Sequence, residues 1–263
     1  MIDPVQPDPL AVVFGGVLGA MIGSFLNVCI LRWGAEPKES IVSPRSHCPR
    51  CSKGLAWYEN VPVLSWVLLR ARCRGCGEPI SVMYPLIELA TAAIWAYMLW
   101  RHGLALEALR GAVFGTILLG IAMTDARLYI IPDEFTWGGL AIGVLFSLAG
   151  GLPALGTALL GAAVGFGLLW LVGTLGTWVF KQDAMGGGDI KMMAMVGAFL
   201  GWQGVLLTIF LGALAGTLIF VPLQLAGRKK LVPFGIFLSV GAAIAYEFGP
   251  AILGWYGGYL MGA

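Results

Sequence analysis

The sequence predicts an all-α polytopic membrane protein, with about eight transmembrane helices and a zinc-ribbon-like cytoplasmic insert. Hydrophobic residues make up 59% of the 263 residues and charged residues only 11%, whereas soluble domains are nearer half apolar and a quarter charged. One long polar segment, residues 32–83, carries four of the five cysteines. The apolar composition makes the lipid bilayer the expected surroundings. The net charge of +2 is too small to indicate a nucleic-acid partner.

The apolar stretches define the candidate spans. The first, residues 10–31, has 22 residues, enough to cross about 30 Å of hydrocarbon. Two others, residues 135–150 and 190–202, are short, and each could be a re-entrant helix beside a water-filled cavity. The remaining candidates are residues 84–100, 108–124, 155–180, 205–226 and 231–253. We therefore divide the chain into three parts: a first span (1–31), a cytoplasmic zinc-binding segment (32–83) and a transmembrane core (84–263).

The basic residues predict the orientation of these spans. With the N-terminus outside, fourteen of the sixteen Lys and Arg residues fall on inside loops, and only Arg101 and Arg110 fall on the other side. Inside loops of membrane proteins are enriched in Lys and Arg. The inside loops are then residues 32–83, 125–134, 181–191 and 227–231.

Four cysteines in the polar segment form two Cys-x-x-Cys pairs, separated by 21 residues: Cys48 with Cys51, and Cys73 with Cys76. This spacing is typical of a zinc ribbon, in which each pair gives two thiolates to one tetrahedral ion. Disulfides or free thiols are the alternatives, but disulfides rarely persist in the cytoplasm. Four thiolates would leave no open coordination position, so we expect a structural Zn²⁺, with neighbouring His47 as a competing ligand.

Several carboxylates lie within or at the ends of apolar stretches, where ionisable groups are costly and are candidates for function. Glu88 and Glu247 could simply hydrogen-bond a neighbouring helix, and Glu134 fits the start of a helix. Asp125 and Asp189 differ from these, because both fall at the same predicted membrane face.

The glycines before Asp189 indicate how a substrate could reach this carboxylate. Gly186, Gly187 and Gly188 precede it, and consecutive glycines are poor helix formers that permit unusual backbone geometry. We expect them to open the helix and to let a substrate backbone come close. Two carboxylates at one face can share a proton and act as general base and general acid. The same pair could equally be the relay of a proton- or ion-coupled transporter.

Five short motifs occur in order along the chain. They are Gly23 to Val28 with Arg32, the cysteine-bearing segment from Cys48 to Cys76, Ile80 to Leu89, Asp125 with Ile131-Pro132-Asp133, and Gly186-Gly187-Gly188-Asp189 with Lys191. Together they resemble the type IV prepilin peptidases, which are bifunctional leader peptidases and N-methyltransferases. In that resemblance the last motif is a G-x-G-D motif.

The resemblance implies an aspartic endopeptidase, which would make residues 84–263 an aspartic peptidase core. Asp125 and Asp189 are the implied catalytic pair; Gly186, Gly188, Lys191 and Asp133 are the supporting residues, and Asp133 is the reserve candidate for the first aspartate. The implied substrates are type IV prepilins or type II secretion pseudopilins, cut after a glycine at the cytoplasmic face of the bacterial inner membrane. A second implied activity is N-methylation of the new N-terminal residue, with S-adenosylmethionine as methyl donor.

Three positions depart from the family pattern. Ala71 stands where a glycine usually precedes the third cysteine, Met83 replaces an arginine, and Ile236 replaces a proline. The first two lie in the segment associated with methylation. A separate alternative to an enzyme is a scaffold of pilus or secretion assembly that keeps the fold without activity.

Overall fold

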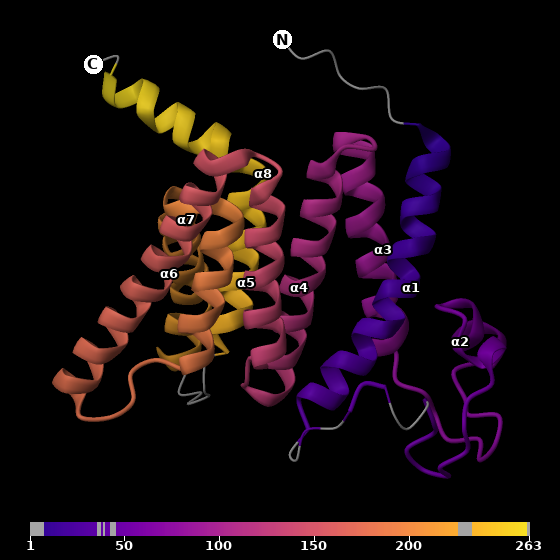
Figure 1. Ribbon diagram of the computed structural model, residues 1–263. Helices are drawn as coiled ribbons and strands as arrows, with labels where there is room; N and C mark the ends of the chain where they lie inside the picture. Colours follow the sequence, from indigo (N-terminus) through magenta and orange to yellow (C-terminus); the bar gives the residue numbers. More distant parts are fainter. Residues whose placement is uncertain (1–7, 36–37, 39, 43–45, 226–232, 262–263) are drawn as a thin grey trace. The chain divides into compact units, whose positions relative to one another are not determined.

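The computed structural model describes residues 8–35, 38, 40–42, 46–225 and 233–261. Arg45 and the whole predicted inside loop 227–231 lie outside the described residues. Within the described residues the chain is helical and has no strand, which confirms the predicted fold class (Figure 1). The helices are α1 (Pro9–Trp33), η1 (Trp57–Asn60, a 3-10 helix), α2 (Leu64–Leu68), α3 (Met83–His102), α4 (Leu106–Leu128), α5 (Asp133–Leu148), α6 (Gly151–Phe180), α7 (Gly187–Leu225) and α8 (Phe234–Met261).

Five of the described helices are long and apolar enough to cross a membrane: α1, α4, α6, α7 and α8. The protein is therefore a multi-pass membrane protein. Helix α5 has 16 residues, which corresponds to about 24 Å, and it coincides with one of the two short predicted stretches. Helix α3 is also outside this set of five, so the count of eight spans stays a prediction.

The two predicted segments 190–202 and 205–226 are the two parts of α7. The helix is interrupted at Gly201, which has φ 68° and ψ 178°. Side chains rarely tolerate this backbone conformation, whereas glycine adopts it readily. The break thus falls at the glycine itself and not in the short gap that the hydropathy pattern indicated.

The chain divides into two compact units, residues 1–120 and 121–263. In the first unit α1 packs along α3 through glycines spaced four residues apart. A Cβ on Gly19 would lie 2.8 Å from the Trp95 Cβ, and one on Gly23 would lie 2.8 Å from the Glu88 Cα. Small residues at such positions let two helix backbones approach closely in a membrane.

In the second unit α7 packs against α5, α6 and α8. The first part of α7 is the most deeply buried run of this unit, and Met192, Met193, Met195, Val196 and Phe199 are almost completely shielded from solvent. Close-packed side chains of this kind leave little freedom to the backbone that carries them. The start of α7, which carries Asp189, is therefore held by a rigid core immediately after it.

Candidate active site

Asp189 lies in the first turn of α7, which begins at Gly187. Its backbone N–H donates to the Gly186 carbonyl at 3.2 Å, and a Cβ on Gly186 would lie 3.0 Å from the Asp189 Oδ2. The Asp189 Oδ1 is buried and has no hydrogen-bond partner among the described residues. Buried polar atoms are usually hydrogen-bonded, so the Oδ1 can accept a hydrogen bond from a water or a substrate group.

Asp125 lies near the end of α4 and is buried. Its Oδ2 accepts a hydrogen bond from the backbone N–H of Ile236 at 3.1 Å. Ile236 is in the first turn of α8, where backbone N–H groups have no partner within the helix. Asp125 therefore caps α8 from a different helix, and it is also close enough to Asp189 for the two carboxylates to interact electrostatically.

Ile131 lies between the glycines beside the two aspartates. A Cβ on Gly188 would lie 2.8 Å from the Ile131 Cβ, and a Cβ on Gly235 would lie 2.8 Å from the Ile131 Cδ1. A Cβ on Gly235 would also lie 2.9 Å from the Asp125 Oδ2. Each glycine is thus required by close packing at the point where its helix begins.

The three glycines before Asp189 act differently from the expectation. None of Gly186, Gly187 and Gly188 has a positive φ, and the last two are already inside α7. Gly188 meets Ile131, whereas a Cβ on Gly187 would meet nothing within 4 Å. The glycines provide space at the start of α7. The prediction that they open the helix through an unusual backbone conformation is therefore wrong.

Asp133 and Lys191 form an ion pair. The Lys191 Nζ donates to the Asp133 Oδ1 at 2.7 Å, and the two side chains are 32% and 48% exposed. The pair joins the first turn of α5 to the second turn of α7. Because its carboxylate is already held by an ammonium group, Asp133 is a weaker candidate than Asp125 for a proton-transferring role.

The cysteine-bearing segment has two loops of the same construction. Cys48 N–H donates to the Lys53 carbonyl at 2.9 Å and Cys73 N–H to the Glu78 carbonyl at 2.8 Å. The fourth residue after each of these cysteines, Ser52 or Gly77, has a positive φ and donates back to the cysteine carbonyl at 2.9 Å. The predicted pair of Cys-x-x-Cys loops is therefore formed.

The four cysteine sulfurs converge on one point. The Sγ atoms of Cys48, Cys51, Cys73 and Cys76 all lie within 4.8 Å of one another, which is close enough to hold a metal ion. Backbone N–H groups of Cys51 and Arg50 lower the pKa of the Cys48 thiol to about 6. The backbone N–H of Glu78 lowers the pKa of the Cys76 thiol, but burial and hydrogen bonds to the other three cysteines outweigh it and raise that pKa to about 11. The convergence of the four sulfurs, and not their protonation, is what indicates a metal site.

Two family models match most of the chain. The model described as the bacterial peptidase A24 N-terminal domain matches residues 17–102, and that of the type IV leader peptidase family matches residues 112–221. The chain is similar to the prepilin leader peptidase/N-methyltransferase of Aeromonas hydrophila, at 36% identity over 269 residues and 90% of each chain. The chain belongs to the type IV leader peptidase family.

Other relatives agree with this assignment. The prepilin leader peptidase/N-methyltransferase of Myxococcus xanthus (strain DK1622) is 44% identical over 218 residues, which is 83% of this chain but 64% of that protein's length. The protein of the same name from Neisseria gonorrhoeae is 32% identical over 261 residues, or 91% of each chain. No solved structure matches the chain. The predicted family and the prediction of an enzyme are thus confirmed.

The type IV leader peptidase model spans both Asp125 and Asp189. Sequence reasoning did not place Gly235 or Ile236 in the site, although both contact Asp125 from α8; Ile236 was noted only as a departure from the family pattern. Gly235 lies within the last predicted apolar stretch, residues 231–253, so it gave no separate signal of this contact. The departure from proline at 236 has a physical consequence here, because a proline has no N–H to donate to Asp125.

Two other residues singled out from the sequence have local structural explanations. Glu88 accepts a hydrogen bond from the Val63 backbone N–H at 2.7 Å, as expected if it serves a neighbouring segment. Ala71, in place of the usual glycine, has φ 56°, a left-handed conformation that glycine would adopt without strain.

Proposed function

We propose that this protein removes the leader peptides of type IV prepilins and that Asp125 and Asp189 are its catalytic pair. The observation that carries the proposal is that these two carboxylates, which are 64 residues apart in the sequence, lie beside the same side chain. A Cβ on Gly188, next to Asp189, would lie 2.8 Å from the Ile131 Cβ, and a Cβ on Gly235 would lie 2.8 Å from the Ile131 Cδ1 and 2.9 Å from the Asp125 Oδ2. The unsatisfied Oδ1 of Asp189 supports it further, because a water or a substrate group bound there would complete its hydrogen bonding.

The proposed chemistry is general acid–base hydrolysis. One carboxylate takes a proton from a water molecule while the water oxygen forms a bond to the scissile carbonyl carbon. The other carboxyl group, protonated at the start, donates its proton and favours the tetrahedral intermediate. The C–N bond then breaks with the electron pair and a proton going to the leaving amine, and the pair returns to sharing one proton.

We propose that the substrate is cut after a glycine at the cytoplasmic face of the bacterial inner membrane, and that pseudopilins of type II secretion are substrates too. The N-terminus of the enzyme is then outside, as the Lys and Arg distribution indicates. This geometry is suited to a pilin precursor, in which a charged leader meets an apolar helix at the membrane surface.

Two bound groups belong to the proposal. The four cysteines hold a structural Zn²⁺, whose binding free energy stabilises a polar segment that has little core of its own. S-adenosylmethionine serves as methyl donor for the new N-terminal amine, an activity named in the relatives.

The test uses the purified protein in liposomes with a synthetic prepilin, and mass spectrometry of the products. We expect wild-type protein to release the leader, and Asp125→Asn and Asp189→Asn to lose at least about a hundredfold in rate. The matched control is Asp183→Asn, an exposed aspartate in the segment just before α7, which should cleave normally.

Two results would contradict the proposal. Cleavage by either Asp125→Asn or Asp189→Asn at the wild-type rate would remove the proposed catalytic pair, with Asp133→Asn as the next variant to examine. Intact prepilin with wild-type protein, together with a proton flux across the liposome that both variants abolish, would favour the transporter.

A further inference from the structure

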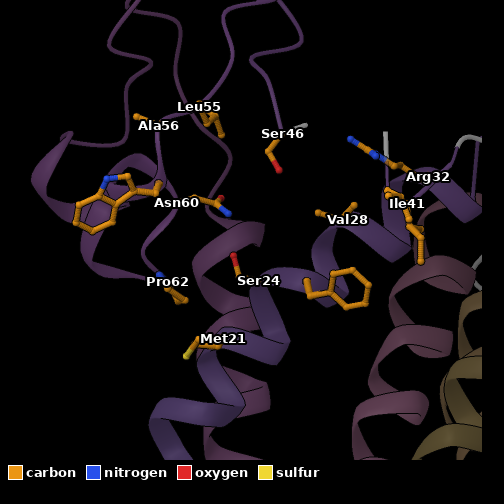
Figure 2. A pocket seen from close by; sticks show the side chains of 13 residues that line it. Met21, Ser24, Val28, Arg32, Ile41, Ser46, Leu55, Ala56, Asn60 and Pro62 are labelled. Atoms are coloured by element: carbon orange, nitrogen blue, oxygen red, sulfur yellow. The ribbon is translucent and has the colours of Figure 1, made fainter. Parts of the chain in front are cut away.

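A pocket of about 530 Å³ lies in the first unit, between α1 and the polar segment. Ser24, Phe25 and Arg32 line it from α1, and Leu55, Trp57 and Asn60 from the polar segment. Figure 2 shows Ser24 and Val28 on α1 opposite Leu55 and Asn60. Pockets for cofactors and small ligands have volumes of roughly 300–1,000 Å³ and mix apolar walls with a few polar groups.

Directly beside this pocket, a strained backbone position is held by a hydrogen bond. Val63, directly after the lining residue Pro62, has φ 60° and ψ −50°, a conformation very unfavourable for a β-branched side chain. The buried Glu88 holds it there by accepting from the Val63 N–H at 2.7 Å, and it also bonds the Ser24 side chain. Strain of this kind persists where the surrounding structure enforces it, and it is concentrated at functional sites.

The wall that carries Trp57 and Asn60 is fixed separately. The Ala56 N–H donates to the Glu59 Oε2 at 2.9 Å and the Lys53 Nζ donates to the Oε1 at 3.1 Å. These partners hold the pKa of Glu59 below its ordinary value, so the carboxylate stays charged and keeps η1 in place at neutral pH. The metal loop that contains Lys53 is thereby tied to the pocket wall.

The lining groups match the parts of one ligand. A tryptophan ring can stack on a purine, and an asparagine amide can hydrogen-bond the edge of an adenine. A guanidinium binds a carboxylate with parallel N–H bonds, and Arg32 is held in position by donating to the Ser40 carbonyl at 2.6 Å. Aromatic faces such as Phe25 also attract cations, including a sulfonium.

We propose that this pocket is the S-adenosylmethionine site, with Trp57 and Asn60 receiving the adenine and Arg32 the methionine carboxylate. The inference rests on the N-methyltransferase activity proposed above and adds the residues that serve it. The sequence has no strand–Gly-rich-loop–helix unit of the usual nucleotide-binding kind, so a pocket made of a membrane helix and a metal-stabilised segment takes that role.

The chemistry that the bound donor supplies is one methyl transfer: the lone pair of the substrate's neutral N-terminal amine forms the N–CH₃ bond, the S–CH₃ bond pair returns to sulfur, and one proton leaves the new ammonium for water. The lining residues contribute binding and orientation. Arg32 and Asn60 fix the two polar ends of the donor.

The experiment measures binding directly, on the full-length protein in detergent with zinc bound. Isothermal titration with S-adenosylmethionine compares wild type, Trp57→Ala and Asn60→Ala. Loss of one base-stacking partner should weaken binding by roughly five- to a hundredfold. The matched control is Trp178→Ala on α6, because Trp178 is 78% exposed and Trp57 is 83% exposed, so both substitutions replace a largely exposed tryptophan.

A second measurement does not depend on any variant folding correctly. Ultraviolet cross-linking of methyl-tritiated S-adenosylmethionine to wild-type protein, followed by proteolysis, should label the peptide that contains Trp57. Zinc content should stay at about one ion per chain in each variant, which checks that the segment is folded.

The outcomes separate this inference from the proposed function. Weakened binding in Trp57→Ala and Asn60→Ala with the label near Trp57 supports the pocket. Wild-type affinity for S-adenosylmethionine in both variants, or a label on another peptide, overturns the assignment of the pocket but leaves the proposed methyltransferase activity intact. If the variants weaken only the binding of a leader peptide, the pocket belongs to the peptide substrate. A wild-type protein that binds no S-adenosylmethionine overturns the pocket together with the methyltransferase proposal.

Discussion

Replacing Gly188 by alanine tests whether the position next to Asp189 must lack a side chain because Ile131 packs against it. The backbone of Gly188 is helical with no positive φ, so alanine can adopt its conformation. The new Cβ would meet the Ile131 Cβ at 2.8 Å, with the Ile131 Cγ1 at 3.4 Å and its carbonyl oxygen at 3.5 Å. The nearest of these atoms belongs to a β-branched side chain close to the main chain, so rotation about χ1 cannot move it away.

The size of the effect follows from that distance. Ordinary contact begins at 3.4 Å, so the start of α7 or the segment before α5 must move by about 0.6 Å, the difference from 2.8 Å. Overpacking costs about 1–3 kcal/mol, and the better helix propensity of alanine offsets about 1 kcal/mol of it. Since a 1 Å misplacement of reacting groups can cost about a hundredfold in rate, we expect Gly188→Ala to cleave at least about tenfold more slowly.

The assay is the initial rate of prepilin cleavage, with thermal unfolding measured in the same detergent. Gly187→Ala is the control, because a Cβ there would meet nothing within 4 Å; it should cleave at the wild-type rate and unfold at the same or a higher temperature. Normal cleavage by Gly188→Ala, or a loss of activity confined to Gly187→Ala, would refute the packing argument.

Three further predictions concern the metal site and the ion pair. Elemental analysis of the purified protein should find about one zinc per chain. Cys51→Ser or Cys73→Ser should abolish this zinc content, whereas Cys29→Ala, on α1, should leave it unchanged. A chelator should lower the unfolding temperature of the wild-type protein. Ala71→Gly should raise that temperature slightly and Gly77→Ala should lower it, because φ is 56° and 72° at these positions and a left-handed alanine costs about 1 kcal/mol. A double-mutant cycle between Asp133→Ala and Lys191→Ala, followed by unfolding, should give a coupling of less than about 1 kcal/mol, since both groups are partly exposed.

The sequence was sufficient to locate the long helices and the two cysteine loops, whereas η1 and α2 in the polar segment were not predicted. Apolar stretches end where polar residues begin, so the predicted stretch 155–180 shares its end with α6 and differs only at its start. The two cysteine pairs were predictable because the spacing within each loop is local. The break in α7 was harder to predict from the sequence, because it depends on the backbone conformation of Gly201 and not on a loss of hydrophobicity.

The site was predictable only residue by residue. Asp125 and Asp189 could be named from their motifs, but their meeting depends on how α4, α7 and α8 pack together. Ile131, Gly235 and Ile236 carry no chemical signal of their own and matter because they lie between helix starts. The pocket beside Arg32 was equally hidden, because its two walls come from segments about thirty residues apart in the sequence.

The position of the carboxylates at helix starts explains how this membrane protein accommodates them. Asp189 and Asp133 are in the first turns of α7 and α5, and Asp125 receives an N–H from the first turn of α8. Helix N-termini present unpaired N–H groups and a partial positive charge, which together stabilise a carboxylate. Among the described residues, Lys191 pairs with Asp133 and no cation pairs with Asp125 or Asp189, so helix ends are the stabilising groups that the described residues provide for these two carboxylates. The proposed mechanism requires such an arrangement, because a carboxylate that is not held by a fixed cation can take up and release a proton.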